Sequence, residues 1–107
     1  MKIKAGIYEH FKGGRYQVYG LCSVEDGHKN YVIYKPLYND TGLWIRPISM
    51  FDESVMRDGE LTKRFSIVEE NDIHVTLAGD TAIHSETQEG YLLSVNNSGL
   101  VAKKINE

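Results

Sequence analysis

The chain has 107 residues, a hydrophobic content of 41% and a formal net charge of −3. This length suits one domain, with or without an ordered extension, and the apolar content is too high for a disordered chain. The sequence has no apolar run near the ~20 residues that a membrane-spanning helix needs, and its N-terminus lacks the apolar core of a signal peptide. We therefore expect a cytoplasmic protein without a membrane segment.

The charge distribution and the single cysteine indicate which partners and which cellular compartment to expect. Residues 1–68 carry ten Lys/Arg and eight Asp/Glu, which gives +2, and residues 69–107 carry two and seven, which gives −5. An excess of +2 is too small to indicate binding to a nucleic-acid backbone, so nucleic acid is a disfavoured partner that stays open. Cys22 has no second cysteine with which to form a disulfide, and we expect it to be a small core residue in a reducing compartment.

The hydrophobic pattern has a period of two and is interrupted by turn residues at short intervals, which predicts an all-β fold. The expected strands, in chain order, cover residues 6–13, 15–24, 31–38, 43–46, 65–68, 73–77, 91–95 and 100–104. Turns that contain Gly are expected at residues 25–28, 39–42, 57–60 and 96–99. Pro47 has no amide donor and should end a strand, and residues 48–51 are expected to form one helical turn.

A short acidic segment at residues 69–72 is the best candidate boundary. We expect residues 1–68 to form a β-barrel domain. Residues 69–107 are expected to be a C-terminal β extension with a hairpin, packed on that domain, because two or three strands alone would be marginally stable.

Residues 34–47 concentrate the most specific chemistry of the chain. Strand alternation puts Tyr34 and Tyr38 on one face and Trp44 and Arg46 on one face of the next strand, and the turn at 39–42 folds the two together. The opposite, aliphatic set should be core: Ile33, Leu37, Leu43 and Ile45. Aromatic rings offer rigid contact area and Arg adds directional donors, so the four aromatic and basic residues are candidate ligand-binding residues. A purely structural role is the alternative, with Arg46 stacked on Trp44 or paired with Asp40.

A second aromatic and basic group lies near the N-terminus. Tyr8, His10 and Lys12 alternate around Phe11 and are further candidate binding residues. His10 could titrate near neutral pH. The alternative is that Phe11 packs in the core while His10 lies at the surface.

The sequence offers no pattern typical of catalysis or of a cofactor. The four histidines are scattered, none is three to five residues from another, and one cysteine cannot build a thiolate zinc site. The nucleophile elbow of hydrolases and the phosphate-binding glycine loops are absent. We expect no catalytic residues, no metal and no cofactor, and hence a protein that is not an enzyme.

Several short motifs resemble a family of small bacterial proteins known as domain of unknown function 1653. They are Gly6-Ile7-Tyr8-Glu9-His10-Phe11-Lys12-Gly13, Tyr31-Val32-Ile33-Tyr34-Lys35-Pro36-Leu37-Tyr38, Trp44-Ile45-Arg46-Pro47, Met50-Phe51 and Arg64-Phe65. The resemblance covers about residues 6–67 and implies a small SH3-like barrel, with residues 70–107 outside it. It implies no activity.

Three functions follow as hypotheses. The first is a binding module that engages a protein or peptide through the aromatic and basic face, as SH3-like barrels commonly do. The second is a small-molecule, nucleotide or nucleic-acid binder that stacks bases on Tyr or Trp. The third is an assembly role, in which exposed edge strands pair two copies into a homodimer.

Overall fold

The computed structural model of the chain describes residues 3–24, 31–71, 77–97 and 99–105. It contains ten strands and one helical turn: β1 Gly6–His10, β2 Arg15–Val24, β3 Tyr31–Pro36, β4 Leu43–Pro47, α1 Ile48–Phe51, β5 Ser54–Arg57, β6 Glu60–Lys63, β7 Phe65–Glu70, β8 Thr81–His84, β9 Gly90–Asn96 and β10 Gly99–Lys104. The prediction of an all-β fold is confirmed. No helix among the described residues is long and apolar enough to cross a membrane.

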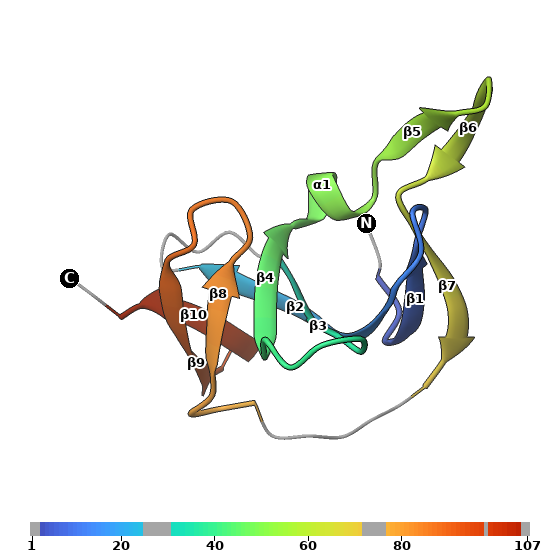
Figure 1. Cartoon of the computed structure of the whole chain (residues 1–107). Helices are drawn as coiled ribbons and strands as arrows, with labels where there is room; N and C mark the ends of the chain where they lie inside the picture. Colours follow the sequence, from blue (N-terminus) through green and yellow to red (C-terminus); the bar gives the residue numbers. More distant parts are fainter. Residues whose placement is uncertain (1–2, 25–30, 72–76, 98, 106–107) are drawn as a thin grey trace.

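Eight of the strands form one sheet in the order β10-β9-β8-β4-β3-β2-β1-β7, and β10 also pairs with β2 (Figure 1). The second pairing closes β2, β3, β4, β8, β9 and β10 into a six-stranded barrel. On the other side of β2, strands β1 and β7 continue the sheet, and Tyr8 of β1 and Phe65 of β7 pack with Phe51 of α1. We call the part from β1 to β7 with α1 the SH3-like part, because it contains the motifs of the family resemblance, and β5 and β6 form a separate hairpin that projects from it (Figure 1).

Strands β2, β3 and β4 are shared by both parts, and this explains why β3 is buried almost throughout. Ile33 and Ile45 face the inside of the closed barrel, where they pack with Cys22 and Leu93. Val32 and Tyr34 belong to the other cluster, which contains Phe51 and Phe65. The expected core role of Ile33, Ile45 and Cys22 is confirmed, since each is at most 2% exposed.

Two expectations about faces are wrong. Leu37 is 50% exposed, because β3 ends at Pro36 and the alternation does not continue past it. Alternation along residues 15–24 predicts that Tyr16, Val18, Cys22 and Val24 share one face of the strand. Instead, Tyr16 and Val18 pack in the SH3-like part, whereas Cys22 and Val24 pack in the closed barrel. The physical reason is a bulge: Val18 lies opposite Tyr34 and Gly20 opposite Ile33, so one extra residue of β2 switches its faces.

The strands after residue 69 complete the barrel wall. The expected C-terminal hairpin is confirmed as β9 and β10, which pair antiparallel. The three C-terminal strands β8, β9 and β10 join the rest of the chain through two parallel pairings, β8 with β4 and β10 with β2. The closed barrel thus takes three strands from before residue 69 and three from after it, while the expected division into two domains at this point stays a prediction.

Edge strands bear on the expected homodimer. Strands β8, β9 and β10 each have a neighbour on both sides, so little of their edges is free, although β10 pairs with β2 only at Val101 and Ala102. Strand β7 ends the order of the large sheet and carries two exposed apolar residues, Ile67 and Val68. Among the described strands of that sheet, β7 is where an edge for a second copy remains, and the homodimer stays a prediction. The strand expected at residues 73–77 and the turn at 25–28 fall almost wholly outside the described residues.

Candidate functional site: an aromatic pocket with one cation

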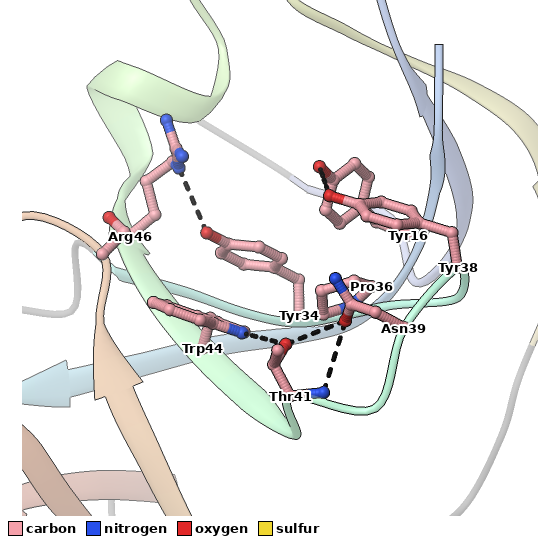
Figure 2. Close-up of a pocket in the computed structure, with 9 residues that line it drawn as sticks. Tyr16, Tyr34, Pro36, Tyr38, Asn39, Thr41, Trp44 and Arg46 are labelled. Carbon is pink, nitrogen blue, oxygen red and sulfur yellow. Dashed lines mark hydrogen bonds between the residues drawn. The ribbon is translucent and has the colours of Figure 1, made fainter. Parts of the chain in front are cut away.

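An open pocket of about 210 Å³ lies over β2, β3, β4 and the loop between β3 and β4 (Figure 2). We call it the aromatic pocket. Its lining comprises four aromatic residues, one proline, one cation and three small polar residues: Tyr16, Tyr34, Tyr38, Trp44, Pro36, Arg46, Asn39, Thr41 and Ser85. The four residues predicted from the stretch 34–47 therefore line one pocket.

The register of the strands builds the floor of the pocket. Tyr34 lies directly opposite Trp44 on β4 and opposite Val18 on β2. Directly opposed residues share a face of the sheet, so the rings of Tyr34 and Trp44 stand on the same side. Tyr16 lies opposite Pro36 in the same way and contributes the next ring, with its centroid 5.7 Å from that of Tyr34 in an edge-to-face arrangement.

Tyr38 forms a rim of the pocket, although it lies beyond the end of β3 and is 60% exposed. Its ring meets Tyr16 edge to face at 5.6 Å between centroids, and the two hydroxyl oxygens lie 2.8 Å apart (Figure 2). Gly14 makes room for this ring: a Cβ there would lie 3.0 Å from Cε1 of Tyr38. Burial and the hydrogen bond with Tyr38 raise the pKa of Tyr16 far above its ordinary value, so its hydroxyl stays protonated.

The loop between β3 and β4 is fixed by its own side chains. Trp44 Nε1 donates to Thr41 Oγ1 at 2.9 Å, and Thr41 Oγ1 donates to Asn39 Oδ1 at 2.9 Å (Figure 2). The backbone amide of Thr41 also donates to Asn39 Oδ1. Asn side chains commonly stabilise turns in this way. The indole of Trp44 is thus held in place at the pocket wall before anything binds.

Arg46 is the only charged residue in the lining. Its Nε donates to the hydroxyl of Tyr34 at 3.3 Å, and its guanidinium carbon lies 5.9 Å from the ring centroid of Tyr34 and 5.7 Å from that of Phe65. The expectation that Arg46 stacks on Trp44 or pairs with Asp40 is wrong, since Tyr34 and Phe65 take that place. No described carboxylate forms an ion pair with Arg46.

The second predicted group lies outside the aromatic pocket. Tyr8 is buried and its hydroxyl donates to the carbonyl oxygen of Lys4, so it is a core residue. The imidazole of His10 packs between Phe11 and Phe65, at 4.7 and 4.9 Å between centroids. Lys12 is exposed and its Nζ lies over the ring of Phe11. None of Tyr8, His10 and Lys12 lines the pocket.

The two groups are nevertheless linked electrostatically. Burial lowers the pKa of His10 below its ordinary value, and the positive charges of Arg64 and then Arg46 lower it further. Lys12 adds to the same effect. Arg64, Arg46 and Lys12 therefore place positive charge near His10. The ring of Phe65 contacts both His10 and Arg46.

Two contributors to the pocket could not be placed from local sequence pattern alone. Tyr16 becomes recognisable once the hairpin of β2 and β3 is drawn in register, because it then opposes Pro36. Ser85 gives no such signal, since it reaches the pocket through the parallel pairing of β4 with β8, whose partner residues lie far apart in the chain.

Neither Cys22 nor the other described titratable residues form a reactive thiol or a metal site. Burial raises the pKa of the Cys22 thiol to about 12, so this cysteine is protonated and packs as an apolar residue. Within the described ranges, no group of three or more His, Cys, Asp or Glu side chains is placed to hold a metal ion.

The fold and the pocket define a small β-barrel protein with an aromatic, singly cationic surface pocket. The chain belongs to the family described as "Protein of unknown function (DUF1653)", whose model matches residues 6–67. A crystal structure of a protein of this family from Bordetella bronchiseptica is similar, with 27% sequence identity and a TM-score of 0.55, and the match covers 67% of this chain and 95% of that chain. No curated protein matches the sequence.

Proposed function

We propose that this protein is a non-catalytic, cytoplasmic binding module that engages an extended segment of another protein at the aromatic pocket. The observation that carries the proposal is the convergence, in an open pocket, of four aromatic side chains and one cation that forms no ion pair with any described carboxylate. Tyr, Trp and Arg are the residue types that dominate binding energy at protein interfaces, because they bury large area at low entropic cost.

The size of the pocket favours a side chain over a whole metabolite. Its volume of about 210 Å³ is below the ~300–1,000 Å³ typical of sites that enclose a drug-sized ligand. Such a space admits one side chain of a segment that runs across the surface. The tied loop and the packed rings also mean that little conformational entropy would be lost on binding.

A selection from a displayed library of random 12-residue peptides tests the proposal. Peptides that bind the wild-type protein should lose about 5-fold or more in affinity to Tyr38→Ala, since truncation of an aromatic side chain that contacts the ligand costs about 1 kcal/mol or more. Tyr38 is mostly exposed, so this variant should keep the fold.

The matched control is Leu37→Ala. Leu37 is the chain neighbour of Tyr38, is 50% exposed and does not line the pocket. It should bind the selected peptides as the wild type does. A library that yields no binders, or binders indifferent to Tyr38→Ala, would refute a peptide site here.

A further inference from the structure

Arg46, the cation of the aromatic pocket, has hydrogen-bond donors that no described residue accepts from. Arg46 uses Nε for the Tyr34 hydroxyl, and its two terminal nitrogens have no hydrogen-bond acceptor among the described residues. Its side chain is partly buried, which weakens the competition from water. A guanidinium is always charged, and its planar fork of donors matches a carboxylate. A ligand that enters beside the Tyr34 ring would therefore meet an unsatisfied cation.

Ser85 adds a second unsatisfied group next to Arg46. Ile45 of β4 lies beside His84 of β8 in parallel register, so the residues that follow, Arg46 and Ser85, are neighbours at the pocket wall. The amide of Ser85 donates to the carbonyl of Ile45, which holds this register. Its Oγ is buried and has no hydrogen-bond partner among the described residues. A buried hydroxyl without a partner costs stability, and a ligand oxygen that reached Oγ would satisfy it.

Nothing in the lining competes for these donors. The lining includes no Asp or Glu, and the acidic residues in the flanking loops, Asp40, Glu86 and Glu89, do not line the pocket. Trp44 Nε1, Thr41 Oγ1 and Asn39 Oδ1 are already used, since they bond to one another. Arg64, the next nearby cation, is paired with Glu53. The pocket therefore complements one negative charge carried on an apolar stem.

We propose that the aromatic pocket receives the carboxylate of an Asp or Glu side chain in the bound segment, held by Arg46 and Ser85 while the rings of Tyr34 and Trp44 contact its methylene groups. This inference rests on the proposed function and names the chemistry of its ligand. A single carboxylate is favoured over a nucleic-acid backbone, because the chain carries a net charge of −3 and would repel a polyanion.

Matched small probes test the charge requirement without knowledge of the natural segment. Phenylacetate, phenylacetamide and inorganic phosphate are each titrated into ¹⁵N-labelled protein, and the indole resonance of Trp44, the only tryptophan, is followed. Phenylacetate should shift this resonance saturably. Phenylacetamide has the same ring and shape without the charge, and should bind about ten-fold or more weakly.

Three variants assign the donors. Arg46→Gln should abolish the preference for phenylacetate over phenylacetamide, and Arg46→Lys should keep only part of it because an ammonium lacks the fork. Ser85→Ala should weaken phenylacetate about ten-fold while its thermal midpoint stays equal to that of the wild type or rises. This last pairing keeps the test valid even if the arginine variants fold poorly.

The outcomes separate this inference from the proposed function. Equal binding of phenylacetate and phenylacetamide, or tighter binding of phosphate at the same resonance, overturns the carboxylate. Selected peptides that need Tyr38 but carry no Asp or Glu overturn it too, and leave the binding module standing. Phenylacetate binding through Arg46 together with an empty peptide selection refutes a protein segment as the source of the carboxylate. Acidic peptides that lose about ten-fold in affinity when Glu is replaced by Gln support both.

Discussion

The side-chain amides of Gln17 and Asn71 form two reciprocal hydrogen bonds, Gln17 Nε2 to Asn71 Oδ1 at 2.9 Å and Asn71 Nδ2 to Gln17 Oε1 at 3.0 Å. Gln17 is the third residue of β2 and is 5% exposed, and Asn71 follows the last residue of β7. The pair therefore ties the strand shared by both parts of the fold to the point where the chain leaves the SH3-like part.

Replacement of Asn71 by Ala should destabilise the protein by about 1–3 kcal/mol, because it leaves Oε1 of the buried Gln17 without its donor, while Nε2 keeps its bond to the carbonyl oxygen of Val18. Urea unfolding followed by Trp44 fluorescence measures the effect. Asn97→Ala, at an exposed turn position, is the control and should change stability by less than about 0.5 kcal/mol. A double variant with Gln17→Ala should cost less than the sum of the single variants, and strict additivity would show that the two amides do not interact.

The neighbours Leu92 and Leu93 on β9 offer a test of how the two parts unfold. Leu93 is fully buried in the closed barrel, and Leu92 is 43% exposed. Leu93→Ala should cost about 2–5 kcal/mol, whereas Leu92→Ala should stay within about 0.5 kcal/mol. Since β4 belongs to both parts, the Trp44 fluorescence transition and the far-UV circular dichroism transition should shift together.

Two separate transitions in the Leu93→Ala variant would contradict this expectation. They would favour the division of the chain at residue 69 into a barrel domain and an attached extension. One shared transition would instead show that the C-terminal strands and the SH3-like part unfold as one unit.

Local pattern predicted those features of the fold that depend on neighbouring residues. Alternation predicted the strands around Tyr34 and Trp44. Gly-containing turns predicted the hairpin of β9 and β10 and the turn at Asp58-Gly59. The meeting of Tyr34, Tyr38, Trp44 and Arg46 followed as well, because one short loop joins their strands.

Long-range pairing explains what the pattern did not reveal. Strand β8 has only four residues and its partner β4 is reached by a parallel pairing, so no hairpin turn marks it in the sequence. The place of Ser85 beside Arg46 depends on that pairing. The bulge in β2 likewise cannot be read from alternation, and it moved Cys22 to the opposite cluster from Tyr16. The contact of Arg46 with the ring of Phe65 was not predicted either, because only the packing of β7 brings Phe65 near.

Substitutions at Gly14 and Gly13 separate the contact between Gly14 and the Tyr38 ring from the effect of backbone strain. Both have positive φ, at +87° and +96°, so Ala at either position should cost about 1–2 kcal/mol of strain. Only at Gly14 would the new Cβ meet a neighbour, the ring of Tyr38 at 3.0 Å. Gly14→Ala should therefore also displace that ring, shift the NMR signals of Tyr38 and Trp44, and weaken any peptide that binds in the pocket. Gly13→Ala is the matched control, and equal pocket spectra for the two variants would argue against this seating.

His10 should make the stability of the protein depend on pH. Its pKa in the folded state lies below the ordinary value of 6.5, owing to burial and to the charges of Arg64 and Arg46. The unfolded chain therefore binds more protons near this pH, so stability is fully present above about pH 6.5 and is lost as the pH falls toward the folded pKa. In addition, His10 Nδ1 accepts a hydrogen bond from the amide of Lys12 at 3.1 Å, and protonation of Nδ1 would break it. Urea unfolding at about pH 7.5 and about pH 5 measures the loss, and His10→Asn, which keeps an acceptor near Nδ1 but does not titrate, should lose less. The same loss in both proteins would assign the pH dependence to other groups.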